Sequence, residues 1–128
     1  GHHSLSHHKG NKPAIEMLKK VNLYQSKLLA YFLNKMKTTM EGDTSLLDNS
    51  IIIAGSALSD GNLHIHNDVP TLVLGAGQGR INGGRHVRYN SEPLSNLHLA
   101  VMDMFETPTD EFVSNDTSDA TGILPGLV

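Results

Sequence analysis

Four histidines stand at positions 2, 3, 7 and 8, within the first eight residues of the chain. Neutral imidazole is the commonest protein ligand for zinc and related metals, so imidazoles gathered in this way indicate a metal site. Two other interpretations are a remnant of a purification tag and a flexible polar terminus. A tag predicts an unbroken run of six histidines, whereas a Ser-Leu-Ser sequence interrupts this one. The spacing therefore favours a contribution to a site.

A second group of candidate ligands lies in "SDGNLHIHNDVP", residues 59–70, where Asp60, Asn62, His64, His66 and Asp68 alternate along the chain. If this segment is extended, a period of two sends all five side chains to the same side. Open α/β sheets bind ligands beyond the carboxyl ends of their strands, and this segment follows a predicted strand. The other interpretation is an ordinary Asx turn with two solvent-facing histidines. Two histidine-rich segments in one small chain favour a shared mononuclear or polynuclear metal centre.

The third group is "GAGQGRINGGRH", residues 75–86, which is rich in glycine and arginine. A dinucleotide fingerprint needs G-x-G-x-x-G at the start of a helix, and the spacing here is G-x-G-x-G followed by another turn. The segment is better interpreted as a glycine-rich turn joining two strands. Arg80 and Arg85 are candidate anion contacts, although arginines at such a position can also be solvated.

The elements that must position these groups follow from the apolar pattern. Apolar residues recur every three or four positions from Pro13 to about Thr39, with lysines mainly on the other face, which predicts a long amphipathic helix. The runs "LLDNSIIIAGSAL" and "TLVLGAG" predict strands buried on both faces rather than an edge hairpin, and "RHVRY" predicts a short third strand. A second helix is expected after Pro93 and an irregular tail after it. The predicted regions are a His-rich loop at 1–10, the helix at 13–39, strands and an Asp/His loop at 49–89, and a helix and tail at 94–128.

This order of elements predicts an α/β protein with the arrangement of a partial three-layer sandwich. Two or three strands are too few for an independent sheet of this type, so we expect the chain to form the C-terminal part of a larger domain. The net charge of −3 gives no reason to expect nucleic acid or an anionic membrane as a partner. The absence of cysteine excludes disulfides and thiolate metal sites. No apolar run approaches the ~20 residues that span a bilayer. We also expect the apolar face of the 13–39 helix to lack cover in the isolated chain.

The segment "HSLSHH", residues 3–8, matches H-x-x-S-H-H, the motif that gives its name to a bacterial protein family without an assigned activity. The resemblance continues through "GDTSLLDNSIIIAGSALSDGNLHIHNDVPTLVLGAGQGRINGGRHVRY", "PLSNLHLAVMDMF" and "LPGL", and so covers essentially the whole chain. The closing region is similar to that of exported bacterial proteins of the alkaline phosphatase/sulfatase-like superfamily. The resemblance implies a large mixed sheet between helices, in a protein several times longer than this chain.

The resemblance also implies a site. Superfamily members hold one or two divalent metals with Asp and His ligands, together with an upstream Ser, Thr or Cys-derived nucleophile. Among the residues of this sequence, His3, His7 and His8 match the motif loop, while Asp60 with His64 or His66 matches the later ligand loop. Zinc is the expected metal, with calcium or manganese as alternatives, and Arg80 or Arg85 the expected anion contact.

The implied activity is hydrolysis of a phosphate or sulfate ester, on a small molecule or a glycan, by an exported protein. No segment bearing a nucleophile matches within the 128 residues, so the chain by itself is expected to be inactive and to need the N-terminal part of the same protein as its partner. An alternative of another class is a non-catalytic exported or cell-surface binding protein that keeps the fold. A further alternative is the product of a truncated reading frame.

Overall fold

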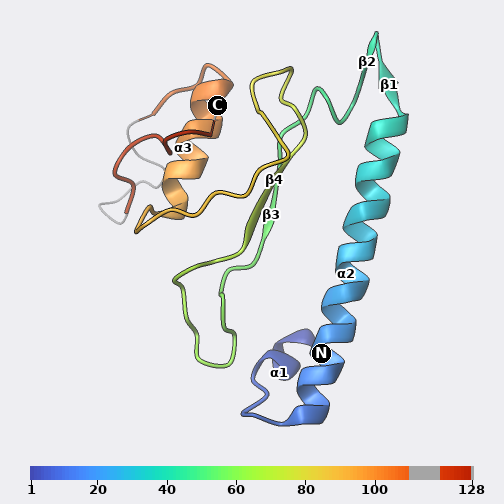
Figure 1. Ribbon diagram of the computed structural model, residues 1–128, viewed down its shortest axis with the longest axis vertical. Helices are drawn as coiled ribbons and strands as arrows, with labels where there is room; N and C mark the ends of the chain where they lie inside the picture. The colour runs from blue at the N-terminus through green and yellow to red at the C-terminus, as the bar shows by residue number, and fades with distance from the viewer. Residues whose placement is uncertain (110–118, 128) are drawn as a thin grey trace.

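The computed structural model describes residues 1–109 and 119–127. The chain mixes helices with two small sheets, so the expected α/β class is confirmed in this general sense (Figure 1). Its elements are α1 (His2–Ser6), α2 (Lys12–Thr38), β1 (Met40–Glu41), β2 (Thr44–Ser45), β3 (Ile52–Gly55), β4 (Thr71–Leu74) and α3 (Leu94–Met104). None of the helices in the described ranges is both long and apolar enough to cross a membrane.

The long helix α2 begins and ends close to the residues that the sequence predicts. Its N-cap is Asn11, whose side-chain oxygen accepts a hydrogen bond of 3.0 Å from the backbone N–H of Ala14, and Pro13 occupies the first turn. At the other end Thr39 is extended, and the chain continues directly into the β1–β2 hairpin, whose turn contains Gly42. This hairpin is not predicted from the sequence.

The predicted His-rich loop at 1–10 contains a short helix that the sequence analysis did not expect, α1, formed by His2–Ser6. Backbone N–H groups of Leu5 and His7 bond the carbonyls of Gly1 and His3, at 3.3 Å each. The side chain of Ser6 donates to the carbonyl of His3 at 2.8 Å. The helical turn brings side chains four residues apart to one face, which places His3 beside His7.

The predicted strands exist, but their arrangement differs from the prediction. β3 and β4 pair antiparallel, with Ile52 opposite Leu74 and Gly55 opposite Thr71, and are joined by a long loop, so they form a hairpin rather than strands buried on both faces. Residues 85–89 form no strand. Their side chains instead bond the backbone of the C-terminal tail: Arg85 donates to the carbonyl of Leu127, and the hydroxyl of Tyr89 to that of Pro125.

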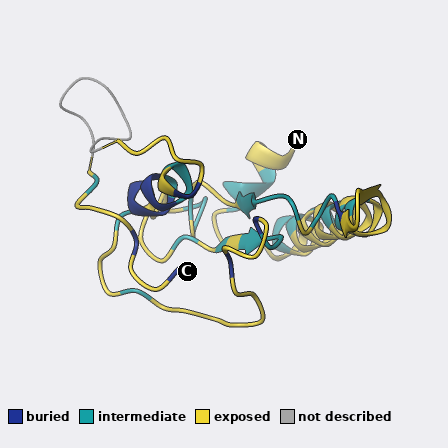
Figure 2. Ribbon diagram, turned by 90° about the horizontal axis from the view of Figure 1, so that it is seen from above, coloured by how far each residue is buried: buried dark blue, intermediate teal, exposed yellow. Residues whose placement is uncertain are grey.

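The buried core lies between α3, the sheet and the tail. Figure 2 shows the buried residues gathered on α3, whereas α2 has exposed and half-buried residues but no buried one. Ile53 and Val73, opposite each other in the sheet, pack against this core. Because side chains alternate across a strand, Ile52, Ala54, Leu72 and Leu74 lie on the other face of the sheet, outside the core cluster. The buried apolar residues of the core are Ile81, Leu97, Ala100, Met104, Leu124 and Leu127.

The tail is held to α3 by a buried asparagine. Asn96 is 1% exposed, and its amide nitrogen donates to Glu92 at 2.7 Å and to the hydroxyl of Thr121 at 2.9 Å. Its side-chain oxygen accepts from the backbone N–H of Thr121 at 2.9 Å, and its carbonyl accepts from Leu124 at 3.1 Å. The predicted irregular tail is confirmed for residues 119–127, and residues 110–118 and 128 lie outside the described part.

The glycine-rich segment forms a turn that packs against the residues preceding β3. A Cβ atom on Gly75, whose φ is +91°, would lie 2.2 Å from the carbonyl oxygen of Ser50, so only glycine allows this approach. The backbone N–H groups of residues 76–78 donate to the carbonyls of Leu47, Ser50 and Asp48 at 2.8–3.3 Å. Because these donors are used within the chain, the turn offers no free row of N–H groups to a phosphate.

Candidate functional site

The two histidine-rich segments lie side by side, as the sequence predicts. The loop that joins β3 and β4 extends toward α1 (Figure 1). The backbone N–H of Lys9 donates to the side-chain oxygen of Asn62 at 2.7 Å, which fastens the end of the His-rich segment to this loop. A Cβ atom on Gly61 would lie 3.0 Å from the Cβ of Ser6, so glycine allows the two backbones to approach closely.

Three imidazole rings meet at this junction. The ring centroids of His3 and His7 are 4.6 Å apart with an edge-to-face angle of 75°, and those of His7 and His64 are 4.7 Å apart with an angle of 45°. We call His3, His7 and His64 the histidine cluster. His7 is its central ring and is half-buried, whereas His3 and His64 are exposed. The cluster therefore lies at the surface, with one face open to solvent.

The electrostatics of the cluster favour a neutral imidazole at its central residue, His7. Partial desolvation lowers the pKa of His7 below its ordinary value, and the charges of His3, His64 and Lys9 lower it further. A neutral imidazole is the form that binds a metal ion. His7 is therefore held in its metal-competent form over a wider range of pH than a solvated histidine.

Of the two interpretations of residues 59–70, the structure shows the Asx turn and not the extended segment. The carboxylate of Asp60 accepts hydrogen bonds from the backbone N–H groups of Asn62 at 2.8 Å and Leu63 at 3.1 Å, which closes an Asx turn. The N–H of Ile65 then returns to the carbonyl of Asp60 at 3.0 Å, and His64 adopts a φ of +55°. The carboxylate thus serves the turn, and the period-two alignment of side chains is lost.

The remaining predicted ligands lie outside the cluster. The Nδ1 atom of His8 accepts a hydrogen bond of 3.1 Å from the N–H of Gly10, and His66 is exposed beyond the turn. Asp68 lies 3.7 Å from Arg88 in an exposed ion pair. Within the ranges that the structure describes, no three His, Cys, Asp or Glu side chains are arranged to hold a metal ion as they stand.

The donor chemistry of the histidine cluster narrows the choice of metal. Imidazole nitrogen suits zinc, copper and nickel, whereas calcium and magnesium require several oxygen ligands. Within residues 1–109 and 119–127 no carboxylate completes a metal-binding group with the three rings, and one oxygen of Asp60 is engaged in its own turn. The residues therefore fit a nitrogen-bound zinc ion in part: the rings are adjacent, but they must reorient before their nitrogens can face one ion.

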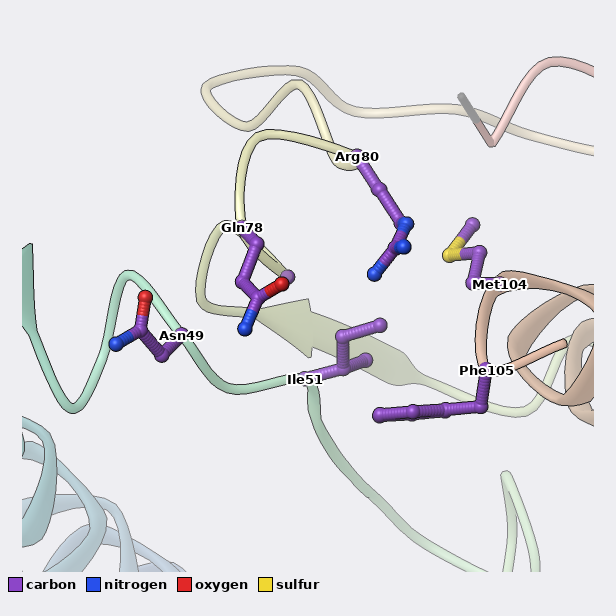
Figure 3. Close-up of a pocket in the computed structure, with 7 residues that line it drawn as sticks. Asn49, Ile51, Gln78, Arg80, Met104 and Phe105 are labelled. Atoms are coloured by element: carbon purple, nitrogen blue, oxygen red, sulfur yellow. The ribbon is translucent and has the colours of Figure 1, made fainter.

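The two candidate anion contacts have different surroundings. Arg80 lines a cavity of about 130 Å³ together with Asn49, Ile51, Gly77, Gln78, Met104 and Phe105. Figure 3 shows its guanidinium reaching over this cavity, and the nearest carboxylate oxygen, on Glu106, is 4.0 Å away. Arg85 instead donates to the carbonyl of Leu127 and so holds the tail. Of the two arginines, Arg80 is the one whose cationic group faces a space that a small anion could enter.

Two asparagines, one at the site and one in the core, have roles that were not identified from the sequence. Asn62 is the bridge between the segments, and Asn96 fixes the tail over α3. The sequence did single out Asn62, as one of the alternating polar residues at 60–68, but it indicated a metal ligand and not a residue that joins the two segments.

Comparisons with models of protein families, with curated proteins and with solved structures give no match to the chain. The resemblance to the H-x-x-S-H-H family therefore rests on the motifs quoted above.

Proposed function

We propose that the chain is part of an exported metal-dependent hydrolase of phosphate or sulfate esters with an alkaline phosphatase-like fold, and that the histidine cluster binds its zinc ion. The observation that carries the proposal is the contact of His7 with His3 and His64, two residues that the fold brings together from different segments. Bringing such rings together disfavours their protonation, a cost that metal binding offsets.

The chemistry of such a centre depends on the metal and on groups that this chain does not supply. A bound zinc ion polarises a phosphoryl or sulfuryl oxygen and stabilises the charge on attacking and leaving oxygens. In this chain, His3, His7 and His64 would hold the ion, and Arg80 would bind an anionic group of the substrate. Additional strands from the N-terminal part of the same protein would pair with the open edges of β3 and β4, since a two-stranded sheet is of marginal stability alone.

Zinc binding by the 128-residue chain tests the proposal directly. We expect one zinc ion per chain in calorimetry, with an affinity that weakens as the pH falls below ~6, because the imidazoles must be neutral to bind. His7→Ala and His64→Ala should each reduce the affinity at least tenfold. His86→Ala, which removes an exposed imidazole outside the cluster, is the matched control and should leave binding unchanged. Zinc binding that survives both cluster variants would show that the assignment is wrong.

The hydrolase part of the proposal needs the longer protein that the resemblance implies. That protein should release phosphate or sulfate from a panel of aryl esters, and both the His7→Ala and the His64→Ala variant should lower kcat/KM. The isolated chain should show no turnover with the same panel. An active longer protein whose kcat/KM is unchanged by the two substitutions would refute the role of the cluster.

A non-catalytic binding protein is the second candidate. It is favoured by the use of Asp60 within its own turn, which leaves the cluster without the carboxylate ligand that the resemblance implies. Zinc would then hold α1 to the β3–β4 loop and have a structural role. This candidate predicts that zinc raises the thermal stability of the longer protein while no ester in the panel is hydrolysed.

A further inference from the structure

Three residues that follow the glycine turn at 75–80, namely Asn82, Gly83 and Gly84, are exposed and lie in no helix or strand. Within the part of the chain that the structure describes, the side chain of Asn82 and the backbone N–H of Gly83 make no hydrogen bond. A Cβ atom built on Gly83 or on Gly84 would meet no atom within 4 Å. We call these three residues the unpacked loop.

The unpacked loop is held only by the residues on either side of it. Before the loop, Ile81 is buried in the core, and its backbone N–H donates to the carbonyl of Ala76 at 3.1 Å. After the loop, the guanidinium of Arg85 donates to the carbonyl of Leu127. Because these neighbours supply the anchoring contacts, the loop itself can change conformation without breaking a hydrogen bond or uncovering the core.

An asparagine that precedes a glycine can convert its own side chain when the backbone between the two residues is free to turn. The backbone nitrogen of Gly83 attacks the side-chain amide carbon of Asn82, a C–N bond forms, and the side-chain nitrogen leaves as ammonia with the proton that the attacking nitrogen gives up. One water molecule then opens the cyclic succinimide at either of its carbonyls, which leaves aspartate or isoaspartate. The reaction consumes water and needs no oxidant or cofactor. Glycine favours it because no Cβ hinders the approach.

The same chemistry is available in the sequence at Asp60–Gly61, but there the structure opposes it. The carboxylate of Asp60 accepts hydrogen bonds from the backbone N–H groups of Asn62 at 2.8 Å and Leu63 at 3.1 Å. A Cβ atom on Gly61 would lie 3.0 Å from the Cβ of Ser6, so this glycine is packed against the His-rich segment. Cyclisation at this position would have to break the Asx turn and the junction of the two segments. The fold therefore distinguishes two positions that the sequence makes similar.

We propose that Asn82 is a site of spontaneous deamidation, selected because it lies in the unpacked loop. The modification places a carboxylate in residues 79–90, a segment with three arginines and no aspartate or glutamate, two positions after Arg80 and three before Arg85. An isoaspartate also lengthens the main chain by one carbon between Ile81 and Arg85. The inference does not depend on the proposed hydrolase function or on zinc, and the histidine cluster takes no part in it.

Incubation of the folded chain in mildly alkaline buffer, followed by peptide mapping with mass spectrometry, gives the first test. The peptide that contains Asn82 should be converted to aspartate and isoaspartate forms before any other asparagine is, at a rate close to that of the chain unfolded in urea. Gly83→Ala should slow the conversion roughly tenfold or more, because a Cβ restricts the backbone. This variant should fold as the wild type does, since Gly83 has no positive φ and a Cβ there meets nothing within 4 Å. A folded chain that converts Asn82 roughly tenfold or more slowly than the unfolded chain, or an unchanged rate in Gly83→Ala, overturns the proposal.

Asp60→Asn provides a matched control within the same chain, because it places a second asparagine before a glycine. The side-chain oxygen of the new amide can still accept the hydrogen bonds of the Asx turn. In the folded variant, position 60 should be converted more slowly than Asn82, and the difference should disappear when the variant is unfolded in urea. Equal rates in the folded variant, or faster conversion at position 60, would overturn the proposal that the unpacked loop selects Asn82.

Discussion

Replacing Asn96 should be among the most destabilising polar substitutions in this chain. The side chain is 1% exposed and makes three hydrogen bonds, to Glu92, to the hydroxyl of Thr121 and from the N–H of Thr121. Each such bond contributes about 1 kcal/mol net, and a buried group that loses its partner costs more. We therefore expect Asn96→Ala to lower the free energy of unfolding by about 2–4 kcal/mol, measured by urea denaturation followed by circular dichroism.

Two further variants separate the hydrogen bonds from other effects. Asn90→Ala removes an exposed asparagine in the segment before α3 and should change the free energy of unfolding by less than about 0.5 kcal/mol. Thr121→Val removes only the hydroxyl that accepts from Asn96 and should cost about 1 kcal/mol. The double variant should cost less than the sum of the single ones, because both remove the same bond. Fully additive losses, or an Asn96→Ala variant as stable as Asn90→Ala, would refute this account of the tail.

Two other changes have effects whose sign follows from the structure. Gly75→Ala should lower the free energy of unfolding, measured by urea denaturation, much more than Gly79→Ala. Both glycines have a positive φ, so both substitutions strain the backbone. A Cβ at Gly75 would in addition lie 2.2 Å from a carbonyl oxygen, whereas one at Gly79 meets nothing within 4 Å. Equal losses would mean that only the backbone strain matters. Hydrogen bonds from the side chain and N–H of Ser45 lower the pKa of Asp48 below its ordinary value. The stability that its carboxylate contributes is therefore present above ~pH 4 and lost as the pH falls through the lowered pKa, so wild type and Asp48→Asn should converge in acid and differ at pH 7.

The helices α2 and α3 were predictable because their signals are local. Asn11 supplies the N-cap and Pro13 the first turn, and the apolar period of α2 continues until the chain reaches Thr39. The same holds for α3, whose apolar residues recur at helical spacing after Pro93. Capping and periodicity depend on residues a few positions apart, so they can be read without knowledge of the fold.

Strand pairing was not predictable in the same way. A run such as Ile51–Ile53 has the composition of a buried strand in a parallel or an antiparallel sheet, and nothing local tells them apart. The residues at 85–89 have strand-like composition too, but Arg85 and Tyr89 bond the tail instead of a neighbouring strand. Which segment a strand pairs with is set by the tertiary structure, and the local sequence pattern does not indicate it.

The candidate site was predictable at the level of segments but not of residues. Two histidine-rich segments were expected to meet, and they do. The sequence could not tell that His64 rather than His66 would reach His7, because this depends on the turn that Asp60 closes. An aspartate at this position can serve either as a metal ligand or as a turn former, and in the structure Asp60 forms the turn through its local hydrogen bonds.

The histidine cluster and the glycine turn are connected through α2, so the position of one depends on the position of the other. A helix of 27 residues spans roughly 40 Å at 1.5 Å per residue. Its C-terminal end is positioned by the bonds between residues 45–50 and the glycine turn, and its N-terminal end positions α1. α1 therefore faces the β3–β4 loop at a place set partly by Gly75, far along the chain from His7. A substitution that displaces the glycine turn should then disturb the histidine cluster without touching any of its rings.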